Sequence, residues 1–129
     1  MHDFFVYYNA NPEKTRKGDC VVRALSKALG QTWERTFIEL CFEAFLMLDM
    51  PSANAVWREY LRRKGFIRKP IEAECDGCYT VRDFCRDHPH GTYVLALDNH
   101  AVAVCGGRFF DTWDSGDETV FYYFERQEK

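Results

Sequence analysis

The chain has 129 residues, of which 47% are hydrophobic and 16% aromatic, and its formal net charge is −3. This length suits a single domain over residues 1–129, and the high apolar content excludes an intrinsically disordered protein. The nearly balanced charge, with no long basic run, argues against nucleic acid as the main partner.

The N-terminal segment and the longest apolar stretch of the chain carry no sign of membrane targeting. The N-terminal segment MHDFFVYYNANPEK lacks the basic lead and the apolar core of a secretory signal. The longest apolar stretch, residues 42–50, contains Glu43 and Asp49 and is too short to cross a bilayer. We therefore expect a soluble cytoplasmic protein without a membrane partner, whose six cysteines are free thiols, metal ligands or a nucleophile.

The first elements of the chain are expected to be a strand and a helix. The aromatic run Phe4–Tyr8 favours a strand, and a polar loop follows it. Apolar residues then recur at helical spacing over Cys20–Leu29, with Asp19 as the expected N-cap and Gly30 as the stop. Cys20 is thus predicted to be the first residue of a helix.

Two more helices are predicted next, each with an apolar stripe. Thr32 is the expected N-cap of the second helix, which should end near Pro51; Ser52 is the expected N-cap of the third, closed by Gly65. The stripe of the second helix comprises Trp33, Phe37, Leu40, Cys41, Ala44, Phe45 and Leu48. That of the third comprises Val56, Trp57, Tyr60 and Leu61.

The second half of the chain changes from helical to β patterns. A less regular stretch from residue 66 leads to Thr80, which with Asp83 forms a near capping box for a short helix to about Asp87. Runs of β-forming residues follow, divided by residues 98–99 and by residues 106–107, with one more run at 119–124. We expect an α+β fold in which helices come first and a small antiparallel sheet second.

Cys20 is placed where a thiol is easily activated. A thiolate is the nucleophilic form of cysteine, and the free N–H groups and dipole of a helix N-terminus favour that anion. The backbone N–H of Cys20 is also unpaired at this position, so it can donate to an oxyanion formed when the thiolate attacks a carbonyl. Such a site also needs a base, and an acid to orient the base.

Of the four histidines, His100 is the best candidate base. His2 lies at the terminus, and His88 and His90 flank a proline in a loop. His100 instead begins the predicted strand HAVAV and is therefore held by a rigid element.

A two-residue turn after that strand predicts an acid beside His100. If Gly106-Gly107 form the turn, Cys105 faces Arg108, and His100 and Asp111 lie diagonally on one face, roughly 7–8 Å apart at the backbone. An acid at that place can accept the imidazole N–H and support the imidazolium.

Three neighbouring residues leave alternatives open. Trp113 shares the predicted face with His100, where it either covers the histidine–acid pair or simply packs on the sheet. Asp114 and Asp117 are alternative acids, although in this register Asp114 points to the opposite face.

The segments GDCVVRALSKAL, GTYVLALDNHAVAV and GGRFFDTWDS, in the order cysteine, histidine, acid, resemble the papain-like cysteine peptidase superfamily. Together they look like the small papain-like cysteine proteases of bacterial and phage genomes. The resemblance implies a helical lobe packed on an antiparallel sheet. It also implies Cys20 as nucleophile, His100 as general base and Asp111, in place of papain's asparagine, as the orienting acid.

The chain departs from the superfamily pattern at one position. The superfamily has a glutamine a few residues before the cysteine as a second oxyanion donor, whereas residues 14–17 are KTRK. The side-chain amide of Asn9 or Asn11 has the right chemistry to replace it. Without a replacement, a catalytically weak or inactive peptide-binding module is the alternative function.

A second alternative is a zinc-stabilised interaction domain. Cys75 and Cys78 form a CxxC pair, and Cys85, His88 and His90 follow it. The spacing matches no standard zinc site, and Cys85 falls on the apolar face of the predicted short helix, which suits a core thiol. We therefore expect a thiol hydrolase that acts on a peptide or isopeptide bond through an acyl-enzyme and that needs neither a metal nor another cofactor.

Overall fold

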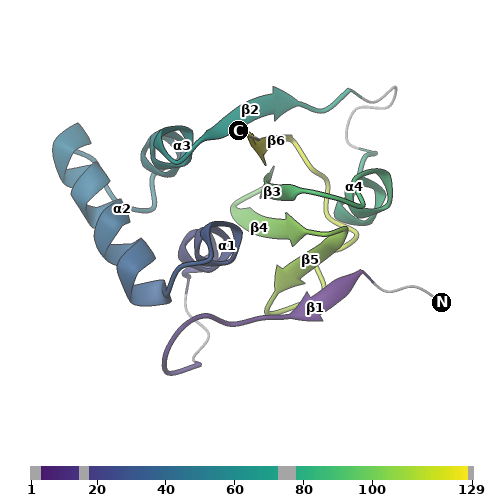
Figure 1. The fold of residues 1–129 in the computed structure, drawn as a ribbon, viewed down its shortest axis with the longest axis horizontal. Helices are drawn as coiled ribbons and strands as arrows, with labels where there is room; N and C mark the ends of the chain where they lie inside the picture. Colours follow the sequence, from purple (N-terminus) through teal and green to yellow (C-terminus); the bar gives the residue numbers. More distant parts are fainter. Residues whose placement is uncertain (1–3, 15–17, 73–77, 128–129) are drawn as a thin grey trace.

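The computed structural model describes residues 4–14, 18–72 and 78–127, which contain four helices and six strands (Figure 1). The helices are α1 (Cys20–Leu29), α2 (Trp33–Met47), α3 (Asn54–Arg63) and α4 (Val81–Asp87). The strands are β1 (Phe5–Tyr7), β2 (Phe66–Pro70), β3 (Thr92–Leu97), β4 (His100–Cys105), β5 (Arg108–Asp111) and β6 (Tyr122–Arg126). The fold is α+β, as the sequence predicts.

The strands form one sheet in the order β1-β5-β4-β3-β6-β2, with helices on both faces. Helices α1, α2 and α3 cover one face and α4 covers the other (Figure 1). Alternation along β3 builds both cores: Val94 and Ala96 pack with α1–α3, while Leu95 and Leu97 pack with α4. The described helices include none that is both long and apolar enough to cross a membrane.

Two edge strands contradict the prediction that the helices come first in the chain and an antiparallel sheet second. β1 pairs parallel with β5, so the sheet is mixed rather than antiparallel. β2, which the sequence pattern did not predict, pairs antiparallel with β6 at the opposite edge. Only Phe66 of β2 is buried, so the charged strand shows no clear alternation, as is common at sheet edges. Both edges of the sheet therefore come from the first 70 residues.

Three helix ends carry the capping or stop residues that the sequence predicts. Gly30 ends α1 in the left-handed conformation with φ 66°. The Thr32 side chain accepts the Arg35 N–H at the start of α2. Thr80 and Asp83 form a complete capping box on α4.

Two expectations about α2 and α3 are wrong. Ser52 is not the N-cap of α3, because the helix begins at Asn54 with Ala53 before it. The predicted α2 stripe is buried at Leu40 and Ala44, but Phe45 is exposed and Leu48 lies beyond the helix end in a left-handed turn. Because apolar residues surround α2 on all sides, the spacing alone did not identify the side that packs on the domain.

The β4–β5 hairpin has the register that the sequence predicts. Gly106 and Gly107 both have positive φ, 59° and 79°, as a tight turn between twisted strands requires. Cys105 therefore faces Arg108, and Ala103 faces Phe110 two positions on. This register brings the end of β5 beside the start of β4.

Alanine substitutions should distinguish the two turn glycines. A left-handed alanine costs about 1–2 kcal/mol, so Gly106→Ala, whose Cβ would meet nothing within 4 Å, should lose about that much unfolding free energy. The Cβ of Gly107→Ala would lie 3.1 Å from the Cα of Pro89, a backbone atom, so this variant should lose more. Urea unfolding measures both, and equal losses would contradict the close approach.

Candidate active site

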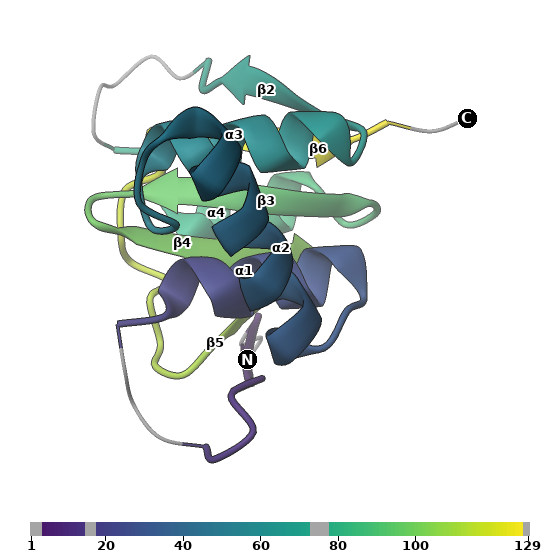
Figure 2. The same ribbon diagram turned by 90° about the vertical axis from the view of Figure 1, so that its left-hand side faces the viewer.

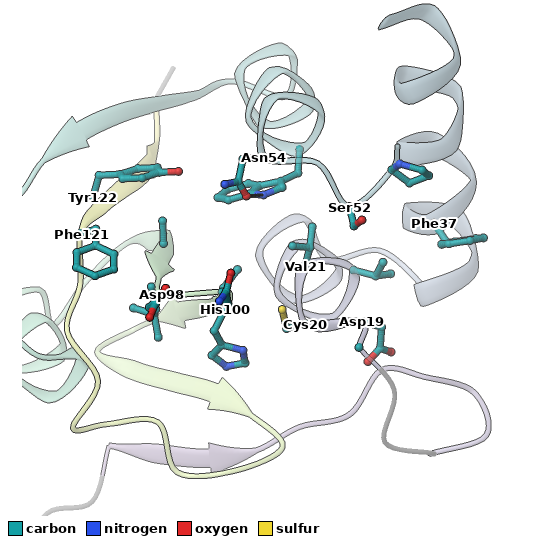
Figure 3. A pocket seen from close by; sticks show the side chains of 18 of the residues that line it. Asp19, Cys20, Val21, Phe37, Ser52, Asn54, Asp98, His100, Phe121 and Tyr122 are labelled. Atoms are coloured by element: carbon teal, nitrogen blue, oxygen red, sulfur yellow. Dashed lines mark hydrogen bonds between the residues drawn. The ribbon is translucent and has the colours of Figure 1, made fainter. Parts of the chain in front are cut away.

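Cys20 lies at the first position of α1 and lines a pocket of about 500 Å³ (Figure 3). The pocket is enclosed by the starts of α1, α2 and α3, by the turn between β3 and β4, and by the start of β6. Its aromatic lining residues are Trp33, Phe37, Trp57, Phe121 and Tyr122. Its polar lining residues are Asp19, Cys20, Ser52, Asn54, Asp98, Asn99 and His100.

The structure brings Cys20, His100 and Asp111 together from α1, β4 and β5. The thiol of Cys20 and the imidazole of His100 lie close enough that each shifts the pKa of the other. Nε2 of His100 lies 2.7 Å from Oδ2 of Asp111, which leaves Nδ1 for the thiol. The imidazole is thus held between the sulfur and the carboxylate, and the contact predicted from the hairpin register is present.

The surroundings of Cys20 favour its thiolate. Burial alone would raise the pKa of the thiol, but the hydrogen bond and charge of His100, the Ala101 N–H and the charge of Arg23 together lower that pKa below its ordinary value. The thiol is half-buried beside the open pocket, so the sulfur is both activated and accessible.

The surroundings of His100 favour its imidazolium. Burial would lower the pKa of the imidazole, but the hydrogen bonds and charges of Asp111 and Cys20 raise that pKa to about 9. The two shifts act in the same sense, because each favours the thiolate–imidazolium pair over the neutral thiol and imidazole. The ring of Trp113 lies 5.2 Å from that of His100 between ring centroids, so this aromatic side chain does lie beside the pair.

Asp111 is almost fully buried and is anchored on both carboxylate oxygens. Burial would raise the pKa of this carboxyl, but hydrogen bonds from His100, Ser115 and the Thr112 N–H, together with the His100 charge, lower it. The Ser115 hydroxyl donates to Oδ2 at 2.7 Å, and the Thr112 N–H donates to Oδ1 at 2.8 Å. These bonds keep the carboxylate ionised and prevent it from rotating away from His100.

The two alternative acids are engaged elsewhere. Both oxygens of Asp114 lie 2.7 Å from Nη2 of Arg82, and Asp117 lies 3.3 Å from Nε of the same guanidinium. Asp111 is therefore the acid that the fold places against His100.

A buried arginine that the sequence analysis did not select connects these groups. Arg23, one turn after Cys20, forms an ion pair with Asp19 and also places Nη2 3.5 Å from Oδ1 of Asp111. The side chain is 7% exposed, so the pairs are screened little by water. A charged residue inside the apolar run of a predicted helix, four positions after an acid, is the signal that could have identified it.

Asp19 has a different role from the one predicted. It stands at the N-cap position of α1, but its side chain makes no capping hydrogen bond. Its carboxylate instead accepts the indole N–H of Trp33 at 2.9 Å and pairs with Arg23. Asp19 thus connects the start of α1 to the start of α2.

The two proposed oxyanion donors lie in the loop before α1. The amide of Asn11 donates to Asp19 at 3.4 Å, and its oxygen accepts the Glu13 N–H at 2.9 Å. The oxygen of the Asn9 side chain accepts the Asn11 N–H at 3.0 Å. Both side chains are buried, and neither belongs to the lining of the pocket that Cys20 lines. The Cys20 N–H, at the first position of α1, keeps the orientation of a helix N-terminal donor.

The proposed zinc ligands that the structure describes are not gathered into a metal site. Cys85, on the buried side of α4, is 1% exposed, and burial raises the pKa of its thiol to about 12. His88 stacks on Phe84, with ring centroids 3.8 Å apart. Cys78 is disulfide-bonded, contrary to the expectation of free thiols, and Cys75 lies outside the described residues. Within residues 4–14, 18–72 and 78–127, no group of three or more His, Cys, Asp or Glu side chains is arranged to hold a metal ion.

Comparison of the chain with protein-family models, with curated proteins and with solved structures finds no match.

Replacing Arg23 should affect both stability and the thiol. Arg23→Met leaves the buried Asp19 and Asp111 carboxylates without their shared cation, so the unfolding free energy should fall by about 3–5 kcal/mol in urea titrations. Because the Arg23 charge lowers the Cys20 pKa, the pH profile of Cys20 alkylation should also move to higher pH.

The matched control is Arg35→Met on α2. Arg35 also pairs with an acid, Glu39, but it is 62% exposed, so its loss should change stability by less than about 1 kcal/mol. Arg23→Lys, which keeps the charge without the planar fork, serves as a milder variant that is expected to fold. Equal effects at positions 23 and 35 would contradict the bridging role of Arg23.

Proposed function

We propose that this protein is a papain-like thiol hydrolase that cleaves a peptide or isopeptide bond. The observation that carries the proposal is the series of Cys20, His100 and Asp111 at the edge of an open pocket, in which His100 binds Asp111 at 2.7 Å and lowers the pKa of Cys20. A thiol with a lowered pKa, a histidine with a raised pKa and a buried orienting carboxylate together match the requirements of covalent catalysis.

In the proposed reaction the Cys20 thiolate attacks the carbonyl carbon of the scissile amide. The carbonyl oxygen becomes an oxyanion, and the Cys20 backbone N–H is the donor best placed to stabilise it. The His100 imidazolium then gives its proton to the leaving amine, and the C–N bond breaks to leave a thioester. Neutral His100 next takes a proton from water, which attacks the thioester and releases the acid product and the thiolate.

The pocket favours an extended peptide with an apolar side chain near the scissile bond. Its walls include the rings of Trp33, Phe37 and Trp57, while the sulfur of Cys20 lies at its side (Figure 3). A pocket lined largely by aromatic side chains gains free energy from burying apolar substrate surface.

A peptide-binding module with weak or no catalysis is the second candidate function. The observation that favours it is the position of Asn11, whose amide donates to the Asp19 carboxylate and which is not itself a lining residue of the pocket. In that case the pocket would hold a peptide while the single backbone donor at Cys20 gives little stabilisation of an oxyanion.

Alkylation rates should identify the activated thiol. With iodoacetamide at about pH 7, Cys20 should react faster than Cys105, whose pKa burial raises, and faster than Cys85. In His100→Ala the hydrogen bond and charge that lower the Cys20 pKa are lost, so its pH profile should move to higher pH. Peptide mass spectrometry measures each site. An ordinary thiol profile for Cys20 in both proteins would contradict the proposed activation.

Hydrolysis of a peptide library should depend on pH through the same pair. Turnover should rise as Cys20 ionises below the usual thiol pKa and fall near pH 9, where His100 loses the proton that it gives to the leaving amine. Asp111→Asn should lower kcat by roughly 10²–10⁴-fold and move the basic limb below pH 9, because Asp111 raises the His100 pKa.

Asp114→Asn is the matched control for Asp111→Asn. Asp114 pairs with Arg82 away from His100, so kcat should stay close to that of the unsubstituted protein. Cys20→Ala should have no turnover. Activated labelling of Cys20 without any turnover, together with peptide binding, would favour the binding module over the hydrolase.

A further inference from the structure

The outward side of α2 is apolar although no described element covers it. The side chains along this side are Ile38, Phe42, Phe45 and Leu46, with exposed fractions of 66%, 63%, 72% and 54%. They lie on the opposite side of the helix from its buried residues. Figure 2 shows α2 as the outermost helix, in front of α1 and α3. We call these four side chains the α2 face.

The α2 face has the size of the largest apolar patches found on monomers, which often have a function. Aromatic side chains carry roughly 150–250 Å² each, so the exposed fractions of the α2 face amount to several hundred Å². Leu48 and Met50 are also exposed and extend the patch beyond the helix end. The largest apolar patch of a typical monomer is about 300–600 Å² and often has a function.

We propose that the α2 face binds the α2 face of a second copy of this chain, with the two helices antiparallel across a two-fold axis near Phe42. Ile38, Phe42 and Phe45 are spaced by four and three residues, which is the spacing that two packed helices share along one seam. Around a two-fold axis at Phe42, Ile38 of one copy meets Leu46 of the other.

Charges at the two ends of the α2 face fit the antiparallel arrangement. Arg35 stands at the N-terminal end, is exposed and pairs with Glu39 of its own helix at 3.0 Å, and Asp49 follows the C-terminal end and is exposed. Antiparallel packing brings Arg35 of one copy near Asp49 of the other, whereas parallel packing would put like charges together. The surface is therefore complementary to itself.

The same charges disfavour a lipid surface as the occupant. The last turn of α2 has no basic residue, and its first turn carries Glu34. The whole chain has a net charge of −3. Helices that bind anionic membranes have a polar face rich in Lys and Arg, which α2 lacks. Stable interfaces bury about 800 Å² on each partner, which the α2 face and its margins approach.

Sedimentation equilibrium over micromolar to submillimolar protein tests the proposal. The unsubstituted protein should approach twice its 15.2 kDa mass, and Phe42→Glu or Phe45→Glu should weaken the dimer by at least about 100-fold. Ile67→Glu is the matched control, because Ile67 is also an exposed apolar residue, at 46%, but lies on β2. Circular dichroism confirms that each variant is folded, since all three side chains are exposed.

A charge exchange tests the antiparallel direction separately. Arg35→Glu alone should weaken the dimer by placing an acid near Asp49 of the other copy, and Asp49→Arg in the same chain should restore it. A mass of one copy at every concentration would overturn the proposal, as would a dimer that Phe42→Glu and Phe45→Glu leave intact. Binding of the monomer to vesicles of neutral and anionic lipid, lost in Phe42→Glu, would also overturn it and assign the face to a membrane.

Discussion

The position of the Arg23 guanidinium between two buried carboxylates is the constraint on which the candidate site depends. Asp19 precedes the thiol on α1 and Asp111 orients the imidazole from β5, so one cation connects the helix to the sheet. Neither carboxylate is exposed enough to be solvated by water alone. Each part of this network therefore needs the others, since a buried charge without its partner costs several kcal/mol. That dependence fixes how α1 approaches the start of β4, and with it the place where Cys20 and His100 meet.

Signs alternate along the series Asp19, Arg23, Asp111, His100 and Cys20. Each ionised group has a neighbour of opposite charge. The low dielectric of the interior strengthens the attraction between these neighbours, and this attraction keeps the groups ionised although they are buried. This arrangement explains why burial, the largest influence on Cys20, His100 and Asp111, does not decide their ionisation. The fold thus favours the ion pair that the proposed hydrolase needs, by lowering the pKa of Cys20 and raising that of His100.

Local features of the chain were predictable, and features set by distant contacts were not. The Gly106-Gly107 turn and the alternation of β4 determine which residues face each other, so the meeting of His100 and Asp111 followed from sequence. The direction in which Arg23 reaches depends on where β5 lies relative to α1, and the pairing of β1 depends on a connection of about a hundred residues. Neither of these long-range contacts leaves a periodic pattern in the sequence. The papain-like character of the whole fold, for the same reason, stays a prediction.

Helix α2 connects the candidate site to the apolar surface of the protein. Its first two turns carry Trp33, whose indole N–H binds Asp19, and Phe37, which lies against Trp33 in the pocket wall with ring centroids 5.1 Å apart. Its middle holds it to the domain through Leu40 and Ala44. The inner side of α2 is thus used twice, for the pocket and for the core, while its outer side is free to bind another surface. A partner on that outer side would restrict the movement of the same helix that forms the substrate pocket, and so would stiffen the aromatic wall without contacting the thiol.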